Sequence, residues 1–106
     1  MTEPVYEVVS PLGRRSVAEQ TPLAPRLADL GGRTVAFVWD HVFKGDVMFE
    51  RFARAATERF PDVRFVPHEA FGNIHGTAQE EEEAIDLLPE RLRAHGVDAA
   101  IVGVGA

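Results

Sequence analysis

Two short segments of the sequence combine the residue types that binding and proton transfer need. The first, DHVFKGD, contains Asp40, His41, Lys44 and Asp46. Asp40 and His41 could bind a substrate or act as an acid and base pair, and Lys44 could hold a carboxylate or a phosphate. The alternatives are a turn-capping aspartate, an exposed histidine and a solvated lysine. We expect Asp46 to cap a helix first, although a cap in this place also shapes an anion pocket.

The second segment, FGNIHG, places Asn73 and His75 between Gly72 and Gly76. The glycines permit close approach of the backbone to a ligand, so Asn73 and His75 are candidate ligand-binding residues. His41 and His75 are the two candidate acid–base residues. The sequence otherwise predicts no catalytic group in this chain, because the chain has no cysteine and therefore no thiol nucleophile of its own.

The sequence also bears on bound metals and cofactors. Side chains that could ligate a metal ion follow the first two predicted strands: Asp40, His41, His68, Glu69 and His75. No H-E-x-x-H or similar spacing places them on one face, so we predict no metal site. The terminal GVGA lacks the third glycine of a dinucleotide fingerprint and does not follow the first strand, so we predict no cofactor.

The composition limits the class of protein. The chain has 106 residues, 45% of them hydrophobic and 26% charged, which is typical of one soluble globular domain. The net charge of −6 disfavours binding to nucleic acid or to an anionic membrane. Neither a leader sequence nor a membrane span is recognisable, and the simplest expectation is a cytoplasmic protein.

Three apolar runs of strand length predict strands at Val35–Trp39, Val63–Val66 and Ala100–Gly103. The segment from Asp46 to about Phe60 predicts a helix, because its apolar residues fall on one stripe; Phe49, Phe52 and Phe60 are assigned to the core.

A second helix is predicted to begin at Thr77, which has the capping-box spacing to Glu80. Pro89 within it removes a backbone donor, so we expect a kink or a break near Leu88.

This order of elements predicts an α/β fold: a three-layer, Rossmann-like or flavodoxin-like βαβαβ unit with a parallel sheet, incomplete at its C-terminus. Residues 34–106 form this domain and residues 1–33 an arm, in which Val5–Val9 could pair at a sheet edge and Pro22–Leu30 could form a short helix. Ligands of such sheets gather beyond the carboxyl ends of the strands. Both polar segments and the terminal GVGA would therefore lie at one edge.

Three motifs resemble those of the UGSC family of thiol or selenol proteins. They are W-D-x-x-F-K-G-D from Trp39, F-G-N-x-H-G from Phe71 and G-V-G-A from Gly103, in the order and at the spacing of that family. The resemblance covers most of the chain from about Thr34 onward. It implies a pocket for a small-molecule substrate, built from Asp40, Lys44, Gly45, Asp46, Gly72, Asn73, His75, Gly103 and Gly105.

In the family that the chain resembles, GVGA is followed directly by selenocysteine or cysteine, then Gly, Ser and Cys. Ala106 stands one residue before that reactive group, which suggests a selenocysteine codon read as stop, a natural split or a deliberate truncation. The resemblance implies thiol redox chemistry or reductive cleavage, similar to the selenocysteine site in component B of glycine-type reductases.

Two function classes follow from this resemblance. The chain is either the amino-terminal half or small subunit of a UGSC-type enzyme, inactive alone, or a non-catalytic binding or partner protein of the same fold. A complementary chain carrying the missing segment is one expected partner, and a second copy of this chain, bound through the Val5–Val9 arm, is the other. Without a partner, no following helix would cover that part of the sheet face, and Ile101, Val102 and Val104 would leave apolar area exposed.

Overall fold

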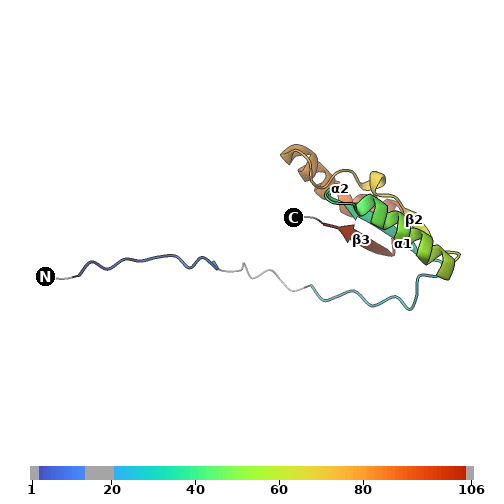
Figure 1. Cartoon of the computed structure of the whole chain (residues 1–106), viewed down its shortest axis with the longest axis horizontal. Coiled ribbons are helices and arrows are strands. Elements are labelled where there is room, and N and C mark those ends of the chain that lie inside the picture. The colour runs from blue at the N-terminus through green and yellow to red at the C-terminus, as the bar shows by residue number, and fades with distance from the viewer. Residues whose placement is uncertain (1–2, 14–20, 105–106) are drawn as a thin grey trace.

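A parallel sheet forms the centre of the protein in a computed structural model, which describes residues 3–13 and 21–104. The sheet contains β1 (Thr34–Trp39), β2 (Arg64–Val66) and β3 (Ala99–Gly103). The strand order is β2-β1-β3, and both pairings are parallel (Figure 1). The predicted α/β class and the predicted parallel strands are therefore confirmed.

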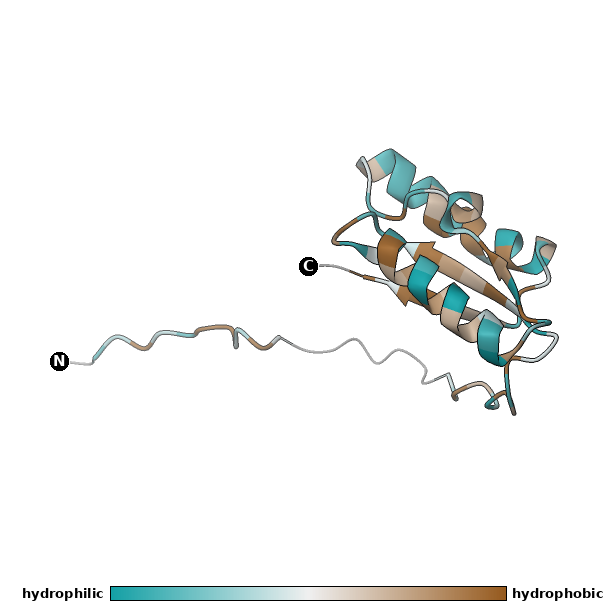
Figure 2. Cartoon of the chain, turned by 45° about the vertical axis from the view of Figure 1, so that its right-hand side comes forward, coloured by the Kyte–Doolittle hydropathy of each residue, from teal (hydrophilic) through white to brown (hydrophobic). Residues whose placement is uncertain are grey.

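Strand β1 lies between the other two strands, and all of its six residues are buried. Alternate side chains point to opposite faces of a strand. Phe37 and Trp39 pack on Phe49 of α1 (Gly45–Arg59), whereas Ala36 and Val38 pack on Phe71. Figure 2 shows the hydrophobic strands between the helices. The sheet is thus covered on one face by α1 and on the other by the segment that contains Phe71 and by α2 (Ala78–Ala94).

The first helix begins two residues earlier than a cap at Asp46 would place it. Its N-cap is Lys44, whose carbonyl oxygen accepts a hydrogen bond from the amide of Met48. Asp46 is therefore not the cap but an acidic residue of the first turn, where the helix dipole favours it. Phe52 is 41% exposed, so its assignment to the core was wrong. It belongs to a groove beside β3 that no further strand covers among the described residues.

The second helix has the predicted capping box. The Thr77 hydroxyl oxygen accepts from the amide of Glu80, and the Glu80 carboxylate accepts from the amide of Thr77. The helix continues through Pro89 without the break considered near Leu88. Leu88 and Leu92 pack against the Phe71 cluster on either side of Pro89, and this packing offsets the lost backbone hydrogen bond. No helix in the described part of the chain is long and apolar enough to cross a membrane.

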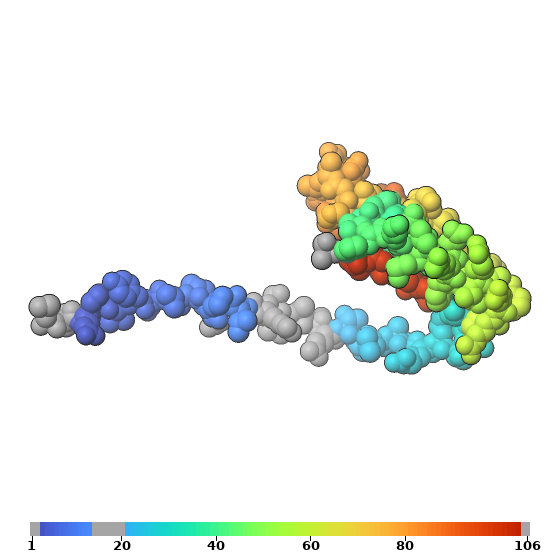
Figure 3. All heavy atoms as spheres, in the orientation of Figure 1, coloured from blue at the N-terminus to red at the C-terminus, as the bar shows by residue number. Residues whose placement is uncertain are grey.

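The structure differs from the sequence analysis in two further segments. The segment between β2 and α2 was assigned no strand or helix from the sequence, but it contains a short helix, η1 (His68–Phe71), whose last residue is fully buried. In the arm, neither Val5–Val9 nor Pro22–Leu30 adopts the strand or the helix considered for it. The arm extends away from the folded body, where no neighbouring strand or helix face supports regular structure (Figures 1 and 3).

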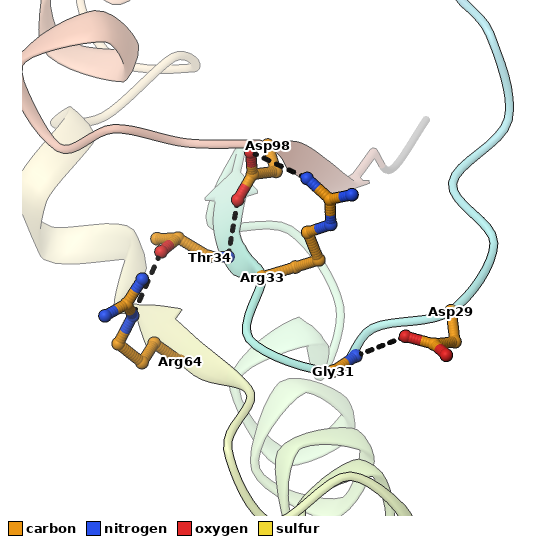
Figure 4. A network of polar contacts seen from close by, with 6 residues as sticks. All are labelled: Asp29, Gly31, Arg33, Thr34, Arg64 and Asp98. Atoms are coloured by element: carbon orange, nitrogen blue, oxygen red, sulfur yellow. Dashed lines mark hydrogen bonds and ion pairs between the residues drawn. The ribbon is translucent and has the colours of Figure 1, made fainter.

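A polar network joins the amino ends of the three strands (Figure 4). A carboxylate oxygen of Asp98 accepts a hydrogen bond from the amide of Thr34 at 2.9 Å, and the amide of Asp98 donates to the Thr34 carbonyl oxygen at 2.8 Å. The Arg64 guanidinium donates to the Thr34 hydroxyl at 3.3 Å, and the Arg33 guanidinium lies 3.8 Å from the Asp98 carboxylate. These contacts hold β3 and β2 in register with β1.

Replacing Asp98 with alanine is expected to lower the free energy of unfolding by about 1–2 kcal/mol, because the partly buried Thr34 amide loses its acceptor. Urea unfolding measures the change. Asp29→Ala is the matched control, since Asp29 accepts from the Gly31 amide at an exposed position; it should cost less than about 0.5 kcal/mol. Equal effects of the two substitutions would contradict this role of Asp98.

Candidate functional site

Trp39, the last residue of β1, is the centre of the candidate site. Its indole nitrogen donates a hydrogen bond to the Val42 carbonyl oxygen at 3.0 Å. The His41 ring stacks on the indole with centroids 4.7 Å apart, and the His68 ring meets it edge-on at 4.9 Å. The segments that follow β1 and β2 therefore meet on one aromatic side chain.

Two of the predicted site glycines make room for this indole. A Cβ atom on Gly45 would lie 2.5 Å from the indole nitrogen of Trp39. A Cβ atom on Gly103 would lie 3.0 Å from a ring carbon of Phe49 and 3.2 Å from a ring carbon of Trp39. Both glycines are thus required by packing at the site.

Asp40 holds the turn that follows β1. It is buried; its carboxylate accepts a hydrogen bond from the Val42 amide at 3.1 Å, and its own amide donates to the Gly103 carbonyl oxygen at 3.2 Å. Asp40 therefore joins the carboxyl ends of β1 and β3. The turn itself places His41 and Phe43 in the left-handed backbone region, with φ values of 63° and 59°.

Left-handed backbone at residues other than glycine is uncommon and is enriched at binding and catalytic sites. In this turn it leaves the His41 and Phe43 side chains exposed next to Lys44, which is also exposed. The candidate acid–base residue His41 and the candidate anion-binding residue Lys44 therefore lie at the surface of the carboxyl edge, above the buried Asp40.

His68 is a residue of this site that the sequence analysis considered only as a metal ligand. Its side chain is 17% exposed, and Nε2 lies 3.3 Å from a carboxylate oxygen of Glu69. Nδ1 is buried without a hydrogen-bond partner among the described residues, and the ring lies 5.3 Å from that of His41. A sequence signal that could have identified His68 is its position directly after Pro67, the proline that closes β2. Within the described residues, no three His, Asp or Glu side chains are placed to hold a metal ion.

Two pockets flank the start of α1. The first, of about 260 Å³, lies between α1 and η1 and is lined in part by Phe37, Asp46, Glu50 and His68. The second, of about 190 Å³, lies between α1 and β3; its residues are Gly45, Met48, Phe49, Phe52, Ile101, Val102 and Gly103. The first pocket has acidic residues at its rim, whereas the second is apolar.

Two other predicted residues, Gly72 and Asn73, line a different pocket. Gly72, with φ of 74°, and Asn73 line a hollow of about 230 Å³ together with Glu80 and Arg91 of α2. The Asn73 side-chain oxygen accepts from the amide of His75, which is exposed. The predicted residues are thus distributed over separate hollows rather than one. Gly105, also predicted, lies outside the described residues.

Comparison with known proteins identifies the family. A search of curated proteins and a search of solved structures found no match. The model of the UGSC family matches residues 7–106, a range that includes every strand and helix of the body and both polar segments of the site. The chain therefore belongs to the UGSC family.

Proposed function

We propose that this chain supplies the substrate-binding side of a UGSC-type redox or reductive enzyme. The reactive cysteine or selenocysteine then lies outside these 106 residues, on a following segment or on a partner chain. The absence of cysteine from the sequence agrees with this division. The strand order β2-β1-β3, with α1 and α2 on opposite faces, supports a flavodoxin-like assignment, because that fold begins with the order 2-1-3.

The observation that carries the proposal is the meeting of the three strand ends at Trp39. Asp40 follows β1, His68 lies just beyond the end of β2, and Gly103 ends β3; all three contact Trp39 or each other. A reactive group carried just beyond β3 belongs to this same edge of the sheet. Parallel α/β sheets bind their ligands there.

The roles of the side chains follow from their exposure. His41, exposed and stacked on Trp39, is the proposed acid–base residue for a proton that leaves or enters the substrate. Lys44 is the proposed contact for an anionic group of the substrate, and the apolar groove between α1 and β3 is the proposed place for its hydrocarbon part. Asp40 acts by holding the turn that presents His41.

The test has two steps. The purified chain alone is expected to show no turnover of peroxide or of other reducible substrates with a simple thiol donor. Sequencing the gene beyond the codon for Ala106, and the neighbouring genes, shows whether a Cys- or selenocysteine-containing segment is encoded. That segment, fused or coexpressed with this chain, is expected to restore turnover.

In the restored enzyme, His41→Gln should lower kcat/KM at least about tenfold, because the proton-transfer group is lost. His95→Gln, at the C-terminal end of α2, is the matched control and should leave kcat/KM unchanged. Turnover by the metal-free chain alone would place the chemistry elsewhere. If no such segment is encoded, the chain is instead a non-catalytic binding or partner protein.

A further inference from the structure

A hollow between α2 and the segment that leads into it is lined by charges of both signs. It measures about 230 Å³, and its lining includes Gly72, Asn73, Glu80, Glu83, Leu87 and Arg91. Among the described residues, neither β3 nor the groove between α1 and β3 contributes to its wall. The hollow is thus formed by one helix and the loop before it.

The positive charge of the hollow is that of Arg91. One of its guanidinium nitrogens donates a hydrogen bond to the Phe71 carbonyl oxygen at 3.1 Å, which fixes the side chain beside the loop. A Cβ atom on Gly72 would lie 3.0 Å from the same nitrogen. No carboxylate in the described part of the chain forms an ion pair with Arg91. A guanidinium has five N–H donors in a planar fork that matches a carboxylate, so most of its donors are left for a ligand.

The negative charges of the hollow come from the first turns of α2. The Glu80 carboxylate accepts a hydrogen bond from the Thr77 amide at 3.1 Å, and the Glu83 carboxylate accepts one from the Gln79 side chain at 3.3 Å. Neither glutamate forms an ion pair with a cationic side chain of the described residues. The hollow therefore has a cation towards one end and two carboxylates towards the other, and these charges do not neutralise one another.

The spacing along α2 sets the length of a ligand that meets both charges. Glu83, Leu87 and Arg91 are four residues apart, so they lie in successive turns on one face of the helix. The rise of the helix separates the Cα atoms of Glu83 and Arg91 by about 12 Å. Leu87 lies between them and is 40% exposed. A ligand that meets both charges must be elongated, with a hydrocarbon segment between its charged groups.

We propose that this hollow binds an elongated zwitterion, with the ligand carboxylate on Arg91 and the ligand ammonium group at Glu80 and Glu83. Hydrogen bonds between ionised groups are stronger than those between neutral groups. Asn73 can assist Arg91, because its side-chain oxygen accepts from the His75 amide and its NH₂ group remains a donor for the carboxylate. This inference does not depend on the proposed function, whose residues surround Trp39.

The probe for this site is ε-aminocaproate, which has an ammonium group and a carboxylate at the two ends of a hydrocarbon chain. When it is titrated into the isotope-labelled chain, the NMR signals of the Gly72 and Asn73 amides should shift and saturate, whereas that of the Gly45 amide should stay in place. Caproate and hexylamine are matched controls, because each lacks one of the two charges. Each should bind at least about fivefold more weakly. Equal affinity for the three compounds, or no saturable shift at Gly72 and Asn73, would overturn the proposal.

Two substitutions test the ends of the hollow separately. Glu83→Gln should weaken binding of ε-aminocaproate at least about fivefold and leave caproate binding unchanged, because only the ammonium group loses its partner. Arg91→Gln should weaken binding of ε-aminocaproate and of caproate but not of hexylamine.

The control for both substitutions is Glu82→Gln, at a neighbouring position of α2 that lines another hollow; it should change none of the affinities. Glu83→Gln leaves the hydrogen bond from Arg91 to Phe71 in place, so its result does not depend on that contact. Equal losses in Glu82→Gln and Glu83→Gln, or an equal loss of caproate binding in Glu83→Gln, would contradict the proposed site. The titrations do not use activity, so their outcome is separate from that of the proposed function.

Discussion

Replacing Phe71 with alanine is expected to lower the free energy of unfolding by about 3–5 kcal/mol, the usual cost of removing a fully buried phenylalanine. Phe71 is 0% exposed and packs with Ala36 and Val38 of β1, with Leu88 and Leu92 of α2 around it. The substitution would leave a cavity between the sheet and α2. Since a small domain is stable by only about 5–15 kcal/mol in total, much of this protein's stability would be lost.

The chain has one tryptophan, so its fluorescence during urea unfolding reports on Trp39 alone. Phe43→Ala is the matched control, because Phe43 is 73% exposed and should cost less than about 0.5 kcal/mol. If Phe71→Ala and Phe43→Ala shift the unfolding midpoint equally, Phe71 is not the core residue that the structure shows.

Replacing Gly45 with alanine is expected to cost about 3 kcal/mol, because one methyl group would displace the central indole of the candidate site. The added Cβ would lie 2.5 Å from the Trp39 indole nitrogen, far inside contact distance. Overpacking of this kind costs about 1–3 kcal/mol. The hydrogen bond from the indole to Val42 would be lost as well, which adds about 1 kcal/mol.

Two readouts separate this effect from a general loss of stability. The fluorescence maximum of the folded Gly45→Ala protein should shift, because the indole leaves its hydrogen bond and its stack on His41. Gly96→Ala is the control: no atom lies within 4 Å of its added Cβ, but its φ is +62°. It should cost about 1–2 kcal/mol through backbone strain without moving the fluorescence maximum. An unchanged maximum in Gly45→Ala would refute the close packing on Trp39.

Local features of the sequence determined the strands and the start of α2. The apolar run in β1 predicts a buried strand by itself, and the Thr77 and Glu80 side chains cap the helix within one turn. Phe71 was missed because it lies in a polar segment without periodicity. Its burial depends on α2, which is later in the sequence, and on β1, which is more than 30 residues earlier. Pro89 is tolerated within α2 for the same reason, since packing between distant segments offsets a local penalty.

For the site, the sequence by itself determined which residues follow the strands, and so placed His41, Lys44 and Gly103 at one edge of a parallel sheet. Only the tertiary structure decided their roles. It buried Asp40 as the support of a turn, made Trp39 the contact between three strand ends, and placed Asn73 at a separate pocket. The physical reason is range: strand periodicity and helix capping act over a few residues, whereas burial and ring contacts depend on segments brought together only by folding.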